Sequence, residues 1–185
     1  MSIPIFLGNV LIVAGTGRNI GKTTLACQLI AHFSKQKEIF GLKITSIYPD
    51  EDAFHGLKSK ALDGEFEITQ EHLTNPNKDT YRMKQAGASK VFFIRTKDAY
   101  LNEALEALFT QIDKKSIIVC ESASLRNFLQ PGLFFMIRPT DELFIKERSR
   151  KLFPFADRIF ISENINHTDI IQSIGLDEFG WKLLK

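Results

Sequence analysis

Residues 10–24 read VLIVAGTGRNIGKTT, and this stretch holds three local signals in order. Five apolar residues, Val10–Ala14, come first and are typical of a strand buried on both faces. Three glycines follow within seven positions, Gly15, Gly17 and Gly21, and they indicate a tight turn. A helix is expected to begin at Lys22. Strand, turn and helix in this order predict one unit of an α/β protein.

The turn has the composition of a loop that holds phosphate groups. Its glycines let backbone N–H groups point inward, and Lys22 at the helix start can reach the outer phosphates of a nucleotide. The positive end of the helix dipole favours the same anion, and the Thr23 hydroxyl is a candidate ligand for Mg²⁺. We therefore expect ATP or GTP, with Mg²⁺, to bind at ten consecutive residues: Gly15, Thr16, Gly17, Arg18, Asn19, Ile20, Gly21, Lys22, Thr23 and Thr24.

The glycine spacing leaves alternatives open. The common phosphate-loop pattern needs glycine at position 16, where this chain has Thr16. The longer loop is similar to that of dethiobiotin synthetase and related ligases, which begins Gly-Thr and ends Gly-Lys-Thr. The glycines also fit a loose dinucleotide-binding fingerprint, although Lys43 ends the next strand where an NAD(P) site needs an acid. A glycine-rich turn with an incidental lysine is the plainest alternative.

Length, charge and cysteine content limit the class of protein. The 185 residues predict a single domain, 1–185, and 24 basic against 22 acidic residues give a net charge of +2. This charge is too small to predict a nucleic-acid surface, and no run approaches the ~20 apolar residues of a membrane helix. Cys27 and Cys120 are expected to be reduced thiols of the core. We therefore expect a cytoplasmic protein without nucleic-acid or membrane partners.

Apolar strands alternate with amphipathic helices along the rest of the chain. Strands are expected at 3–14, 39–43, 66–69, 91–94, 116–121, 133–137 and 158–162. Helices are expected at 23–35, 79–86, 100–112, 141–152 and 168–174, and a polar loop at 45–64. Because the strands are apolar throughout, the pattern predicts a mostly parallel sheet covered by helices on both faces. The fold class predicted from the sequence is α/β, a three-layer fold of the P-loop NTPase type.

Charged side chains end two of these strands, Glu121 on one and Lys43 on the other. The carboxyl ends of parallel strands meet at one edge of a sheet, so both side chains are expected near the phosphate loop. Glu121 is a candidate Mg²⁺ ligand together with Thr23, and Asp50 is another. Lys43 and Arg18 are candidates to neutralise charge on the transferred phosphate. The alternative is that each of these residues is an ordinary solvated charge.

A second resemblance covers most of the chain. Residues 78–88, KDTYRMKQAGA, resemble the Asp-Ser-x-Arg-x-x-x-Ala-Gly-Ala segment of the molybdopterin-guanine dinucleotide biosynthesis protein B family, small P-loop proteins of similar length. Cys120-Glu121-Ser122 stands where that family has Val-Glu-Gly, and Phe134 to Arg138 takes the place of a strand ending in Arg. The resemblance implies a GTP-binding homodimer in molybdenum cofactor biosynthesis, with Asp79 and Arg82 near the substrate.

Several interpretations stay open beside this resemblance. Asp79 and Arg82 lie one helical turn apart, so they also fit a simple ion pair. Asn164 follows a predicted strand and is a candidate contact to the nucleotide base, or part of a turn. The chain is expected to hydrolyse the nucleotide or transfer its phosphate to an unknown small acceptor. A slow nucleotide-dependent adaptor for a biosynthetic partner enzyme is the alternative, and an NAD(P)-binding protein is the third hypothesis.

Overall fold

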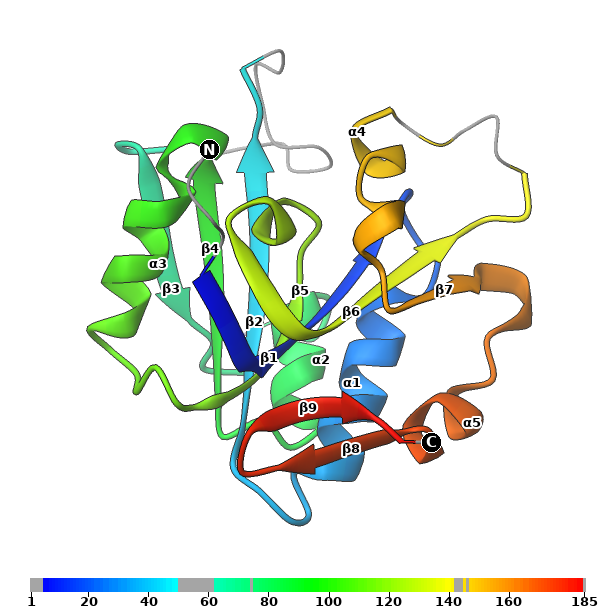
Figure 1. Ribbon diagram of the computed structural model, residues 1–185. Coiled ribbons are helices and arrows are strands. Elements are labelled where there is room, and N and C mark those ends of the chain that lie inside the picture. The colour runs from blue at the N-terminus through cyan, green and yellow to red at the C-terminus, as the bar shows by residue number, and fades with distance from the viewer. Residues whose placement is uncertain (1–4, 50–61, 74, 142–144, 146, 185) are drawn as a thin grey trace.

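A seven-stranded sheet runs through the molecule (Figure 1). The computed structural model describes residues 5–49, 62–73, 75–141, 145 and 147–184. Along the sheet the strand order is β3-β4-β2-β5-β1-β6-β7, and only the β3–β4 pair is antiparallel. The strands are β1 (Ile5–Gly15), β2 (Ile39–Ile47), β3 (Phe66–Gln70), β4 (Lys90–Lys97), β5 (Ile117–Glu121), β6 (Leu129–Arg138) and β7 (Arg158–Ile161). The expected mostly parallel sheet is confirmed.

Strand β1 lies near the middle of the sheet, between β5 and β6. Its residues Val10–Ala14 are at most 2% exposed, as a parallel strand covered on both faces requires. Alternate side chains of β1 enter different apolar clusters: Val10 and Ile12 pack on one face, Leu11 and Val13 on the other. This explains why the first strand is a continuous apolar run.

Helices cover both faces. The cluster that contains Leu11 includes side chains of α1 (Lys22–Phe33), α2 (Asp79–Gln85) and α5 (His167–Gln172). The opposite cluster includes side chains of α3 (Leu101–Phe109) and of the 3₁₀ turn η2 (Ser124–Asn127). The result is an α/β arrangement of three layers. The remaining short helical segments are η1 (Asp98–Tyr100), α4 (Glu147–Arg150), η4 (Phe153–Phe155) and η5 (Ser162–Asn164).

The C-terminal part differs from the sequence prediction. In the expected helix 141–152, the described helical residues are only those of α4, and the chain turns at η4 soon after. The last helix ends at Gln172, and Ile174 instead begins β8 (Ile174–Asp177), which pairs with β9 (Gly180–Leu183) in a separate antiparallel sheet. Gly180 has φ 119°, which lets the chain close this hairpin in two residues. The hairpin lies beside α5 and β1 (Figure 1).

No helix in the described ranges is both long and apolar enough to cross a membrane.

Candidate functional site

The loop between β1 and α1 is shaped by its glycines and by Ile20. Gly21 has φ 96° and stands directly before α1, without any side-chain cap. A Cβ at Gly15 would lie 2.7 Å from Cδ1 of Ile20 and 2.9 Å from Cδ of Lys22, so a side chain there would require these two side chains to shift. Because Ile20 packs inward against the core, the loop is a tight turn with a fixed course.

Some residues of this loop line a pocket, and others lie behind the pocket wall and do not contact the cavity. Thr16 lies behind the wall: its amide donates to the Ile137 carbonyl at 3.0 Å, and its buried hydroxyl has no partner among the described residues. Gly17 and Ile20 also lie outside the lining, and the Gly17 carbonyl accepts a hydrogen bond from the Lys22 ammonium. The loop residues that line the pocket are Gly15, Arg18, Asn19, Gly21, Lys22, Thr23 and Thr24.

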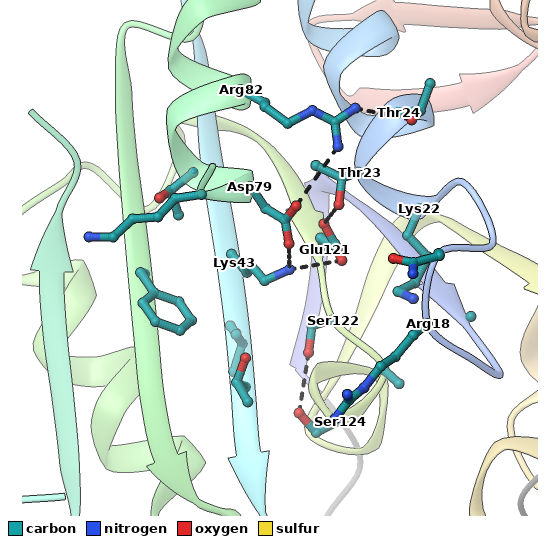
Figure 2. A pocket seen from close by; sticks show the side chains of 18 of the residues that line it. Arg18, Lys22, Thr23, Thr24, Lys43, Asp79, Arg82, Glu121, Ser122 and Ser124 are labelled. Carbon is teal, nitrogen blue, oxygen red and sulfur yellow. Dashed lines mark hydrogen bonds and ion pairs between the residues drawn. The ribbon is translucent and has the colours of Figure 1, made fainter. Parts of the chain in front are cut away.

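Four side chains from four elements form what we call the Lys43 network (Figure 2). The Thr23 hydroxyl donates to Oε2 of Glu121 at 2.7 Å, and Nζ of Lys43 donates to Oε1 at 3.0 Å. Lys43 also donates to Oδ2 of Asp79 on α2. Glu121 is 5% exposed, so both of its oxygens are bonded within the protein. The network joins the starts of α1 and α2 to the carboxyl end of β5 and the middle of β2.

Strand register explains why these residues meet. Glu121 on β5 is the register partner of Val13 on β1 and of Lys43 on β2. Residues paired across parallel strands share a face, here the face covered by α1 and α2. Glu121 ends β5, as expected, and Lys43 meets it beside the β1–α1 loop. The expectation that Lys43 ends its strand is wrong, because β2 continues to Ile47 and Lys43 lies in its middle.

The charges in the network are coupled. Burial alone would lower the pKa of Lys43, but the Glu121 and Asp79 carboxylates outweigh it and raise that pKa. The pKa of Asp79 is lowered, because bonding to Lys43 outweighs the effect of burial. Burial lowers the pKa of Lys22, and the nearby Lys43 ammonium adds to the effect. The Lys43–Glu121–Asp79 group is thus a mutually neutralising set of charges, and an added anion beside Lys22 would favour the charged form of that ammonium.

Arg82 connects α2 to α1. Its guanidinium donates to the Thr24 hydroxyl at 3.1 Å and lies 3.9 Å from Oδ1 of Asp79. The structure agrees with both hypotheses for this pair: Asp79 and Arg82 form an ion pair at i, i+3, and both line the pocket. Neither side chain caps α2, whose N-cap residue is Lys78 without a side-chain cap bond.

These groups surround a pocket of about 890 Å³ at the carboxyl edge of β1, β5 and β2. Its volume lies within the range of small-molecule sites. Sequence reasoning missed several residues of its wall: Ser46, Tyr48, Lys78, Phe93 and Ser124. Ser46 could have been found by asking which residues lie near the carboxyl end of β2, and Phe93 by asking which residue of β4 pairs with Lys43. That step needs the strand order, which spacing along the chain does not contain.

Hydroxyl groups line another part of the pocket. Ser46 donates to the Ser124 hydroxyl at 2.8 Å, and Ser124 lies 3.2 Å from the Ser122 hydroxyl. Beyond Ser46 the Tyr48 ring packs under Arg148 of α4, whose guanidinium carbon lies 4.1 Å from the ring centroid. The three serine hydroxyls and the Tyr48 side chain give the wall a polar, uncharged stretch next to the Lys43 network.

Three other predicted site residues have separate outcomes. Arg18 is exposed and lines the pocket, with its side chain directed toward the Ser124 side (Figure 2). Asn164 is exposed in η5 and is outside the pocket lining. Asp50 lies outside the described residues. Among the residues that are described, no group of three or more His, Cys, Asp or Glu side chains is arranged to hold a metal ion.

Comparisons of the chain with protein-family models, with curated proteins and with solved structures gave no match.

Proposed function

We propose that this chain is a P-loop protein that binds ATP or GTP with Mg²⁺ and hydrolyses or transfers the terminal phosphate. The observation that carries the proposal is the contact between the Thr23 hydroxyl and the buried Glu121 carboxylate, 2.7 Å apart, beside Lys22. A hydroxyl at a helix start, a carboxylate on the neighbouring strand and a lysine at the loop are the groups that Mg²⁺-nucleotide chemistry needs.

The residues present fit Mg²⁺. This ion usually takes one or two protein carboxylates and completes its shell with water and phosphate oxygens, so Glu121 and Thr23 suffice as protein ligands. Buried carboxylates are costly without cationic partners, and Glu121 has Lys43 at 3.0 Å. When bound, the ion would neutralise charge on the terminal phosphates.

The chain's own residues have distinct proposed roles. Backbone N–H groups of the β1–α1 loop and the start of α1 bind phosphate oxygens, and Lys22 pairs with the outer phosphates. Lys43, kept protonated by its two carboxylates, and Arg18 stabilise the charge that develops as the terminal phosphate leaves. Asp79 and Arg82 hold Lys43 and α1 in position from α2.

Titration with ATP and with GTP, each with and without Mg²⁺, tests the proposal by calorimetry. We expect Mg²⁺-dependent binding, and Lys22→Ala should weaken it at least about tenfold, since a charge-assisted contact contributes about 1.5–3 kcal/mol. Lys35→Ala, an exposed lysine in the turn after α1, is the matched control. Equal affinity of Lys22→Ala and the unchanged protein would overturn the proposal.

Phosphate release then separates the two ways in which such a protein acts. Rapid release with a small acceptor supports a phosphoryl-transfer enzyme. Slow release that a partner enzyme accelerates supports the adaptor of cofactor biosynthesis that the family resemblance implies.

A further inference from the structure

The pocket continues past the Lys43 network, toward the antiparallel edge of the sheet. Lys43 is the register partner of Glu121 on β5 and of Phe93 on β4, and all three line the pocket. Neighbouring strands lie about 4.8 Å apart, so Phe93 stands roughly 10 Å from Glu121 on the same face. The floor of the pocket is therefore an acid, an ammonium and an aromatic ring in a row across the sheet.

The pocket wall at the start of α2 carries an unpaired positive charge. Lys78, at the start of α2, lines the pocket, is exposed, and has no hydrogen bond or ion pair from its ammonium within the described part of the chain. The carboxylate beside it, Asp79, already bonds Lys43 and lies near Arg82. Lys78 therefore offers a positive charge to the pocket at this end.

The start of α2, which forms this end of the pocket wall, is held in place by a buried hydrogen bond. Thr80 is 4% exposed, and its hydroxyl donates to the buried Glu71 carboxylate at 2.6 Å, which fixes the first turn of α2. Phe93 is half-buried, so part of its ring is open to the pocket. A fixed wall, a flat apolar floor and a free ammonium suit a small molecule with an apolar body and one negative charge.

The role of this part of the pocket follows from where it lies relative to the phosphates of a bound nucleotide, and this inference rests on the proposed function. Thr23 and Glu121 mark where the metal and the outer phosphates would lie, so the nucleoside extends away from β5 on the β1 side. Lys43 and Phe93 lie on the other side, beyond the terminal phosphate. We propose that the region between α2 and strands β2 and β4 binds the second substrate, a small organic anion whose apolar body lies on Phe93 and whose charge pairs with Lys78.

Three probes that share a ring and differ in charge test this inference: benzoate, benzamide and benzylammonium. Binding is measured by NMR saturation transfer and titration, with and without saturating Mg²⁺-ADP. Benzoate should bind most tightly. Lys78→Gln should weaken benzoate about three- to fivefold, the range of an exposed ion pair, and leave benzamide unchanged. Phe93→Leu, which keeps an apolar side chain, should weaken all three probes, and Lys35→Gln should change none.

Equal binding of the three probes, a benzoate affinity that Lys78→Gln leaves unchanged, or no binding of any probe would each overturn the inference. The nucleotide titrations stand apart from this result. If nucleotide fails to bind while benzoate still depends on Lys78, the proposed function is wrong and the anion site remains. If nucleotide binds and benzoate does not, only the second-substrate site is wrong.

Discussion

Glu121 shows how one side chain can connect three elements. It is 5% exposed, accepts hydrogen bonds from Thr23 of α1 and Lys43 of β2, and itself ends β5. Its charge is therefore held by the protein in the position that the proposed function assigns to a metal ligand. A buried and hydrogen-bonded carboxylate is a stronger candidate for a metal ligand than its place at a strand end alone suggests, since an acid at a strand end is more often solvated.

Replacing this charge tests its role at the scale of one residue. Under the proposed function, Glu121→Gln should weaken nucleotide binding about tenfold or more in the presence of Mg²⁺ and change it little in the absence of Mg²⁺. The double titration, with and without Mg²⁺, measures this difference. Glu103→Gln, at an exposed position of α3, is the control. An equal loss under both conditions would show that Glu121 acts on folding and not on the metal.

The two cysteines give a prediction about pH. Burial raises the pKa of the Cys27 thiol to about 11, although Arg82 opposes the shift, and burial raises the pKa of Cys120 well above its ordinary value. Thiolates are the reactive form, so iodoacetamide should modify neither cysteine of the folded protein at pH 8. Modification of Cys27 should begin as the pH approaches 11. Mass spectrometry after timed quenching measures this.

The control for that experiment is the protein in guanidinium chloride, where both cysteines should react at pH 8. The same shift predicts lower stability in alkali. The unfolded chain ionises Cys27 from pH 9.0 upward while the folded protein does not, so the free energy of unfolding falls as the pH rises above that value. Rapid modification of the folded protein at pH 8 would contradict the buried environment of both thiols.

At the scale of elements, the β1–α1 loop depends on one glycine more than on the others. Gly21 has φ 96°, and a Cβ there would meet only Ile165 at 3.6 Å, so the cost of a side chain lies in the backbone. Gly21→Ala should lower the free energy of unfolding by about 1 kcal/mol. Gly17→Ala, in the same loop without positive φ and with only an ordinary contact to Ile20 at 3.6 Å, should change it little. Urea denaturation compares the two variants, and equal costs would contradict this assignment of strain.

The local pattern of apolar residues predicted the strand and the helix that flank this loop, but it failed for elements of only a few residues. Residues 10–24 fold as expected because an apolar run, a glycine turn and an amphipathic helix each leave a clear local signal. Strands β8 and β9 are only four residues each, too short for a clear alternating pattern, so no element was predicted after residue 174 and the hairpin was missed. In the expected helix 141–152, the described helical residues are only Glu147–Arg150, and Pro154 in the turn η4 limits any continuation of that helix.

The site was predictable in its members and not in its contacts. Glu121 and Lys43 were expected near the loop because each was predicted to end a strand. Their ion pair depends on β2 lying beside β5, although more than seventy residues separate the two in the chain. The contribution of Phe93 depends on β4 lying next along the sheet. Strand order is a property of tertiary packing, so no reading of spacing could supply it.

At the scale of the whole molecule, the C-terminal hairpin closes the core against α1. Trp181 of β9 is 4% exposed, its ring packs edge-on against Phe33 at 4.9 Å, and its indole N–H donates to the Asn9 carbonyl at 3.1 Å. Trp181→Ala should lower the free energy of unfolding by about 3–5 kcal/mol through the cavity it leaves. Trp181→Phe should cost less, since it keeps most of the packing.

Thermal unfolding followed by circular dichroism at 222 nm measures both variants, because Trp181 is the chain's single tryptophan and fluorescence is lost with it. For a chain of this length, the alanine variant should unfold about 6–20 °C below the unchanged protein. A shift as small as that of an exposed variant such as Phe179→Ala would show that the hairpin is not part of the cooperative fold.

The central place of β1 also has a consequence for synthesis. Val10 pairs with Ile118, a partner that the ribosome adds more than a hundred residues later. At a translation rate of about 5–20 residues per second, this apolar segment waits roughly 5–20 s in the nascent chain before Ile118 is synthesised. During that interval it is exposed to other nascent chains and to chaperones. Translation speed and chaperone supply are therefore expected to change the yield of folded protein, while the free energy of unfolding of the folded protein stays the same.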